Sequence, residues 1–304
     1  MENPNRMALD LVDEAIDFAD ELAVGVHHLE NDAAVLDFGV ERRGGLEAGV
    51  LLTEAATGGL ATVHVELDTV AGAALPHVEV ATDHPRPALL ACQSPDWPLE
   101  VDGEALRGAG PAQHFRDAGP NAGDFDDADF AVLVLEADRL PDEALAETVA
   151  NVAGVPTSGV FVLVAPASSV AGGVAFAARA AERTISRLAG GGYDAGRIRT
   201  VAAGAPVAPI ADDEDEARVR SAGAIAYGGR VHIVVEEDVA RPGRLAYGGD
   251  GRGIPEPAVI EEGGHPDRLD DVLAPAQVTV DVVGGPTHVV GGVDEGLLGE
   301  RLGL

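Results

Sequence analysis

Residues 129–166 read DFAVLVLEADRLPDEALAETVANVAGVPTSGVFVLVAP, and this stretch indicates the fold class. It contains two apolar runs, FAVLVLEA and GVFVLVAP, each of the length of a buried strand. Between them, LPDEALAETVANVAG carries acidic residues where a helix would begin and Gly154 where it would end. Strands that alternate with helices in this way are typical of an α/β layer architecture. The stretch therefore predicts an α/β fold.

The alternation continues toward the C-terminus. A loop and a helix over 174–189 are expected after the second strand, then a third strand in RIRTVAAGAPVAP. A helix from about residue 212 and the strand VHIVVEE follow. Residues 238–271 are rich in Gly and Pro and are expected to form a long surface loop. The last segment, QVTVDVVGGPTHVVGGV, predicts a hairpin, and a short helix ends the chain.

The N-terminal third is less regular. Residues 5–23 place apolar side chains among acids at roughly the helical period. The runs VGVHHLE and AVLDFGV alternate around the turn pair Asn31-Asp32, which predicts a hairpin. Its His27-His28 pair is not expected to bind a metal, because neighbouring strand residues point to opposite faces. GGLEAGVLLTEAATGGLATVHVEL suggests a buried helix or a strand pair, and PHVEVATDHPRPALLACQ a strand, a loop and a short helix.

Charge is the extreme feature of the composition. The 304 residues, enough for two domains, include 52 acidic and 20 basic residues and carry a net charge of −32. All the basic residues are arginine. A dense carboxylate surface repels itself unless salt screens it, which indicates the salt-rich cytoplasm of a halophilic archaeon. Nucleic-acid binding is disfavoured because phosphate contacts need clustered cations.

Cysteine content and hydropathy exclude further classes of protein. Cys92 is the only cysteine, which excludes an intramolecular disulfide and a cysteine-based zinc site. The N-terminal stretch MENPNRMALD lacks the basic and apolar regions of a signal peptide. The longest apolar runs are too short to span a bilayer. We expect a soluble, cytoplasmic protein with no membrane partner.

The stretch FAARAAERTISRL, residues 176–188, contains the strongest candidate pair, Arg179 and Glu182. A helical wheel places them with Ala175 and Ser186 along the border of an apolar face formed by Val174, Ala177, Ala178, Ala181, Ile185 and Leu188. They are either a surface ion pair, worth about a few tenths of a kcal/mol, or an acid–base pair facing a pocket. The pattern by itself favours the surface pair.

Three further groups are candidate ligand contacts. Ser168 and Ser169 precede the same helix, near an N-terminus that favours a polar ligand. Thr82, Asp83 and His84 lie at the C-terminal end of an expected strand, where α/β proteins place ligand contacts, although a helix cap with a surface histidine is the simpler interpretation. The acids from Asp212 to Glu216 suit a divalent cation or a helix start, and the pattern favours the helix start. Dinucleotide, Walker and nucleophile-elbow motifs are absent from the sequence.

Several stretches, taken together and in order along the chain, resemble the methenyltetrahydromethanopterin cyclohydrolase family. The N-terminal ones are GGLEAGVLLTEAATGGLATV (44–63), PHVEVATDHP (76–85) and DDADFAVLVLEADRLPDE (126–143). They continue in VFVLVAPASSVAGGVAFAARAAE (160–182), APVAPIADDEDEA (205–217), YGG (227–229) and LAPAQVTV (273–280). The resemblance covers nearly the whole chain except for 238–271.

The resemblance implies an archaeal enzyme of one-carbon metabolism. The family hydrolyses the methenyl bridge of a reduced pterin carrier to the N5-formyl derivative, without a metal or cofactor, as a homotrimer of two-domain α/β subunits. The active-site cleft would lie between the domains, here expected at 1–95 plus 272–304 and at 96–271. The catalytic Arg-x-x-Glu motif falls on Arg179 and Glu182, with Glu182 as the general base. Carrier contacts are expected at Thr82, Asp83, His84, Ser168, Ser169 and Asp212.

Two positions depart from the family pattern. Gln113 stands where the family usually has arginine, and Ala222-Gly223 stand where it usually has Asn-Asp. These changes leave open a folate-like carrier and a non-catalytic pterin-binding paralogue. A third alternative, a metal-dependent hydrolase, would use Asp83, His84 and the acids at 212–216.

Overall fold

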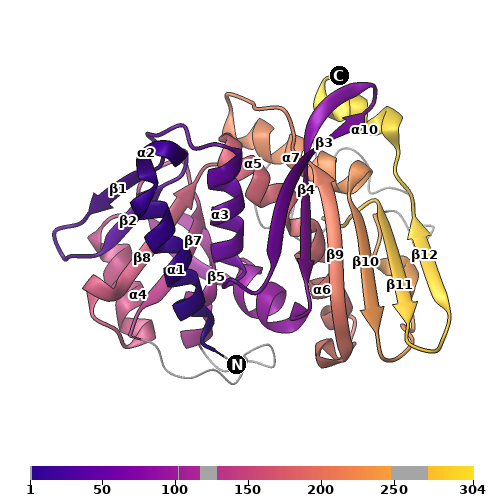
Figure 1. Cartoon of the computed structure of the whole chain (residues 1–304), viewed down its shortest axis with the longest axis horizontal. Coiled ribbons are helices and arrows are strands. Elements are labelled where there is room, and N and C mark those ends of the chain that lie inside the picture. Colours follow the sequence, from indigo (N-terminus) through magenta and orange to yellow (C-terminus); the bar gives the residue numbers. More distant parts are fainter. Residues whose placement is uncertain (1, 102, 117–128, 248–272) are drawn as a thin grey trace. The chain divides into compact units, whose positions relative to one another are not determined.

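The computed structural model describes residues 2–101, 103–116, 129–247 and 273–304 (Figure 1). The chain forms two compact units, each built on a six-stranded mixed sheet. The first unit comprises residues 1–62 and 86–175, and the second comprises 63–85 and 176–304. The α/β fold class expected from the sequence is confirmed.

The first sheet has the strand order β1-β2-β8-β7-β6-β5. Its strands are β1 (Gly25–His28), β2 (Ala34–Asp37), β8 (Val160–Ala165), β7 (Ala131–Glu136), β6 (Glu104–Ala109) and β5 (Trp97–Val101). The predicted strand–helix–strand stretch is confirmed: β7 and β8 are parallel neighbours joined through α4 (Glu143–Ala153). Asp142 caps that helix by accepting from the Leu145 N–H at 3.1 Å, and Gly154 ends it with a φ of 70°.

Helices cover both faces of this sheet. α1 (Pro4–Asp17) and α3 (Leu46–Ala56) pack side by side with one face, as Figure 1 shows, and α4 packs against the other. Along β7, Val132 and Val134 face the α1–α3 layer while Leu133 and Leu135 face the α4 layer. Strand residues alternate between faces, so a strand buried on both sides is apolar throughout.

Short elements complete the first unit. They are α2 (Ala19–Leu22), the π-helix η1 (Arg86–Gln93), and the 3-10 turns η2 (Pro111–Phe115) and η3 (Thr157–Gly159). The β1–β2 hairpin follows the prediction, with Asp32 at a φ of 67° in its turn. The β5–β6 hairpin is a structural finding that the sequence pattern did not predict.

The second sheet has the order β12-β11-β10-β9-β4-β3. Its strands are β12 (Thr287–Gly291), β11 (Gln277–Val282), β10 (Arg230–Val235), β9 (Ile198–Pro206), β4 (Ala73–Thr82) and β3 (Thr62–Val70). β10 and β11 are parallel, while β9 runs antiparallel to both β10 and β4. α6 (Arg179–Gly190) and α7 (Glu214–Gly228) pack against β9, and α10 (Glu295–Leu302) packs on α7. The 3-10 turns η4 (Ala195–Arg197) and η5 (Pro242–Arg244) also belong to this unit.

This pairing explains why the units differ from the expected ranges 1–95 plus 272–304 and 96–271. β4 pairs with β9, which brings residues 63–85 into the second unit. β11 pairs with β10, so the C-terminal residues join the second sheet and not the N-terminal one. Strand pairing between distant segments decides both boundaries.

The helix expected at 174–189 consists of two helices. α5 (Val170–Ala177) and α6 are separated by Ala178, whose φ of −62° and ψ of −17° remain near helical values. The boundary between the units falls within α5, after Ala175. Most of the expected loop at 238–271 lies outside the described residues. Among the described helices, none is long and apolar enough to cross a membrane.

Candidate functional site

α6 presents the apolar face that its sequence predicts. Ala181, Ile185 and Leu188 are buried, and the helix packs against β9 and β10 (Figure 1). Arg179 and Ser186 are partly exposed along the border of this face. Glu182, between them, is fully buried. A buried carboxylate on a helix is rare unless it is paired, so its partners define the site.

Three side chains of α6 surround the Glu182 carboxylate. Arg183 donates from Nε to Oε2 at 2.5 Å and from Nη2 to Oε1 at 2.6 Å. Ser186 donates its hydroxyl to Oε1 at 2.7 Å. The Arg179 Nε lies 3.8 Å from Oε2, which is an ion-pair distance. The Arg183 contact is a two-point fork, the strongest geometry an arginine offers a carboxylate.

The surface ion pair that the sequence pattern favoured is therefore wrong as a description of Glu182. The side-chain exposure of Glu182 is 0% and that of Arg179 is 14%. Arg179 also places its guanidinium over the Phe176 ring, 5.2 Å from the ring centre. Glu182 is thus a buried, multiply hydrogen-bonded carboxylate with two arginines beside it.

Arg183 is the residue that the sequence pattern missed. A helical wheel separates neighbouring residues by about 100°, so positions i and i+1 are not expected to meet. The long arginine side chain can nevertheless fold back along the helix surface to reach the residue before it. The charge order Arg-x-x-Glu-Arg was the available signal, since a buried acid between two arginines can pair with either.

The expected contacts at the end of β4 form a turn. Thr82 is buried, and its hydroxyl accepts the His84 backbone N–H at 2.9 Å. Asp83 and His84 are exposed. These residues belong to the same unit as Glu182. Thr82 therefore fixes the turn and leaves Asp83 and His84 facing solvent.

The two serines before α5 lie in the first unit. Ser169 donates its hydroxyl to the Pro166 carbonyl at 2.8 Å and accepts the Gly172 N–H at 2.9 Å. It therefore caps the beginning of α5. Ser168 is partly buried.

The acids at 212–216 form a helix start, as the simpler interpretation predicted. Asp213 caps α7 by accepting the Glu216 N–H at 2.9 Å. The next acids pair with arginines one turn along the helix: Glu214 and Asp215 with Arg218, and Glu216 with Arg220. Asp212 precedes them and is exposed. These acids stabilise α7 through its cap and through its i,i+3 and i,i+4 pairs.

The two departures from the family pattern have structural roles here. Gln113 donates its amide N–H groups to the Cys92 carbonyl at 2.9 Å and the Ser94 carbonyl at 2.6 Å, so it caps the end of η1. Ala222 is buried within α7. A Cβ added at Gly223 would lie 3.2 Å from the Arg301 Cβ of α10, so a small residue suits this helix contact.

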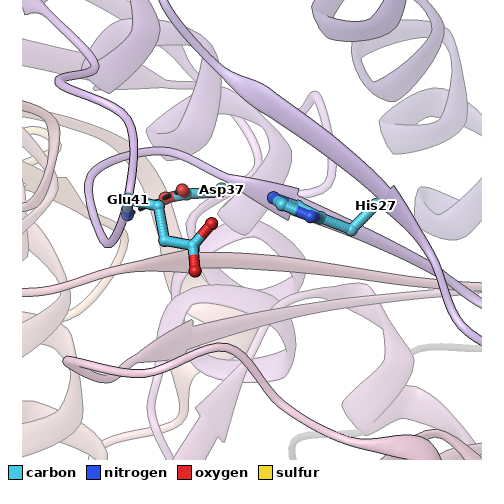
Figure 2. A group of neighbouring side chains, drawn as sticks. All are labelled: His27, Asp37 and Glu41. Carbon is cyan, nitrogen blue, oxygen red and sulfur yellow. Dashed lines mark hydrogen bonds between the residues drawn. The ribbon is translucent and has the colours of Figure 1, made fainter.

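One group of side chains has the composition of a metal site. The ligand atoms of His27, Asp37 and Glu41 lie within 4.8 Å of one another, and Figure 2 shows the His27 ring directed toward the two acids. The Asp37 oxygens, however, accept four backbone N–H groups at 2.6–2.9 Å, from Gly39, Val40, Glu41 and Arg42. Two donors on each oxygen engage its lone pairs. Asp37 anchors the loop after β2, and its chemistry does not fit a metal ligand.

Comparison with known proteins relates the chain to one family. A family profile described as "Cyclohydrolase (MCH)" matches residues 4–246. A methenyltetrahydromethanopterin cyclohydrolase of Halobacterium salinarum is 44% identical, and the alignment covers 100% of both chains. The protein of the same name from Methanococcoides burtonii is 32% identical over 99% of this chain and 98% of its own. That of Methanothermobacter marburgensis is 32% identical over 100% of both. This chain therefore belongs to the methenyltetrahydromethanopterin cyclohydrolase family.

Proposed function

We propose that this chain hydrolyses the methenyl bridge of 5,10-methenyltetrahydromethanopterin to the N5-formyl derivative, with Glu182 as the general base. The names of its relatives support the substrate and the reaction. The main support for this role of Glu182 is its environment. The side chain is buried, Arg183 donates hydrogen bonds to both carboxylate oxygens, and the Arg179 Nε lies 3.8 Å from Oε2. A carboxylate that surrounding groups hold in one orientation is suited to accept a proton from water.

The substrate chemistry suits this set of side chains. The bridging carbon belongs to an amidinium cation and is already electrophilic, so water can attack it directly. As the C–O bond forms, one water proton passes to the Glu182 carboxylate. Glu182 then gives this proton to the bridging nitrogen that is not N5. The bond between the bridging carbon and that nitrogen breaks, and the nitrogen keeps the bonding electrons. The hydroxyl proton of the adduct is released as the formyl C=O forms, so one proton is produced per turnover.

Arg179 would act electrostatically beside this step. Its guanidinium stands near Oε2 and rests on Phe176. A cation at this distance attracts the buried Glu182 carboxylate, which is the proposed proton acceptor.

We further propose that the carrier contacts Thr82, Asp83, His84, Ser168, Ser169 and Asp212, and that the enzyme works in the cytoplasm as a homotrimer. The exposure of Asp83, His84 and Asp212 leaves their side chains available to a ligand. The reduced pterin is a substrate, so the proposed reaction needs no bound cofactor.

The test compares two carriers in molar potassium chloride. Hydrolysis of methenyl-tetrahydromethanopterin and of methenyl-tetrahydrofolate is followed by the loss of their absorbance, with and without a chelator. We expect rapid hydrolysis of the first compound, slower hydrolysis of the second, and no effect of the chelator. Rates equal to those in buffer would contradict the proposed function, and a preference for the folate compound would assign a folate-like carrier.

A further inference from the structure

We propose that Arg183 and Ser186 are positioning residues that orient the Glu182 carboxylate so that Oε2, and not Oε1, receives the proton from water. This inference rests on the function proposed above, and it assigns a role to two residues outside the Arg-x-x-Glu motif. It follows from how the hydrogen bonds are divided between the two oxygens.

Oε1 has no lone pair left for a proton. It accepts from Arg183 Nη2 at 2.6 Å and from the Ser186 hydroxyl at 2.7 Å. A carboxylate oxygen offers about two lone-pair positions, and these two donors fill them. Protonation at Oε1 would require one of these bonds to break inside a buried site.

Oε2 keeps one lone pair among the contacts of the described residues. It accepts a single hydrogen bond, from Arg183 Nε at 2.5 Å. The Arg179 Nε, at 3.8 Å, lies beyond hydrogen-bond distance, which is at most about 3.2 Å for N–H···O. The free lone pair and the Arg179 cation are therefore at the same oxygen.

Ser186 is what makes the two oxygens unequal. The Arg183 fork alone gives each oxygen one hydrogen bond and would leave both equally able to accept a proton. Ser186 lies four residues after Glu182 and hence on the same side of α6, one turn along. Its hydroxyl occupies the second lone pair of Oε1, so that Oε2 is the oxygen that can accept a proton.

The two-point fork also fixes the plane of the carboxylate. A lysine at position 183 would keep the positive charge but would act as a single point donor, free to shift between the oxygens. If the carboxylate plane were no longer fixed, Glu182 would be misaligned with water. Substrate binding would be unaffected because it depends on other groups. We therefore expect Arg183→Lys to lower kcat by roughly 10–100-fold with little change in KM.

The experiment measures kcat and KM for the wild-type chain and for four variants. They are Arg183→Lys, Ser186→Ala, Ser186→Thr and the matched control Arg187→Lys. Arg187 lies on the same helix and donates to the carbonyls of Leu273 and Arg244, with no contact to Glu182. Thermal unfolding of each variant separates a loss of folded protein from a loss of turnover.

Ser186→Ala removes one hydrogen bond and should fold even if Arg183→Lys does not. We expect its kcat to fall roughly tenfold with KM unchanged, because a hydrogen bond to a charged group is lost. Ser186→Thr keeps the hydroxyl and should restore most of the wild-type kcat. Arg187→Lys should turn over like the wild type.

The results separate the two proposals. A wild-type chain without turnover would overturn the proposed function and this inference with it. An active wild type whose Ser186→Ala variant keeps the wild-type kcat would overturn this inference alone. The same holds if Ser186→Thr is as slow as Ser186→Ala, or if the variants change KM instead of kcat.

Discussion

Glu182 places a negative charge inside the protein, where a carboxylate is costly unless it is paired and hydrogen-bonded. Arg183 and Ser186 supply three hydrogen bonds that offset this cost. Arg179 adds a second cation without taking a hydrogen-bonding position on the carboxylate. The two arginines are therefore expected to differ in role. Arg183 orients the Glu182 carboxylate through hydrogen bonds, whereas Arg179 acts on this carboxylate through its positive charge.

That difference is testable with Arg179→Ala. Turnover should fall by roughly 10–100-fold, since the cation beside Oε2, the oxygen proposed to accept the proton, is lost. Steady-state kinetics of both enzymes at one pH measures this. Equal rates would show that Arg179 takes no part.

His77 on β4 provides a pH dependence of stability. Burial lowers the pKa of its imidazole below the ordinary 6.5, and this outweighs the opposing effect of the nearby Asp68 carboxylate. The unfolded chain then binds a proton that the folded protein does not. The free energy of unfolding should fall as the pH drops through 6.5 toward the lowered value.

The variant His77→Gln removes this contribution. Its free energy of unfolding should depend less on pH than that of the wild type between about pH 7 and 5. Chemical denaturation at constant high salt measures both slopes. Parallel curves for the two proteins would mean that His77 does not titrate in this way.

At the scale of elements, the apolar runs of the sequence predicted β7, α4 and β8 well because these elements are buried on both sides. The β5–β6 hairpin was missed although Asp102-Gly103, between its strands, is a typical hairpin turn pair. Pro98 and the polar residues of both strands weaken the strand pattern on either side of it. The surroundings of Glu182 were predicted only in part. Helical periodicity places Ser186 near Glu182, but it carries no information on which way the Arg183 side chain folds.

The beginning of α5 depends on a close backbone contact that only glycine allows. A Cβ at Gly172 would lie 1.9 Å from the Pro166 carbonyl oxygen, so Gly172→Ala should destabilise the fold by about 1–3 kcal/mol. Gly190, at the end of α6, has nothing within 4 Å of an added Cβ. Gly190→Ala should therefore be neutral or stabilise by up to about 1 kcal/mol. Denaturant unfolding checks both, and equal effects would contradict the packing argument.

At the scale of the whole molecule, the net charge of −32 makes salt part of the structure's stability. Carboxylates repel one another, and the repulsion is screened over about 10 Å at 0.1 M salt and about 3 Å at 1 M. The fold and the proposed trimer should both be lost as potassium chloride is removed. Circular dichroism and sedimentation across a salt series measure this, and an unchanged fold and mass at millimolar salt would refute it.

The most direct test of the account is the kinetics of Glu182→Gln. Glutamine keeps the shape of the side chain but cannot serve as the base, so kcat should fall by roughly 10²–10⁴ while KM changes much less. Breaking a buried ion pair also lowers stability, by about 3–5 kcal/mol, so the assay must use protein whose circular dichroism shows it to be folded. The Glu182→Gln variant should be folded, bind substrate and be nearly inactive. Near-normal turnover with reduced thermal stability would contradict the role of Glu182 as the base and leave it with a structural role.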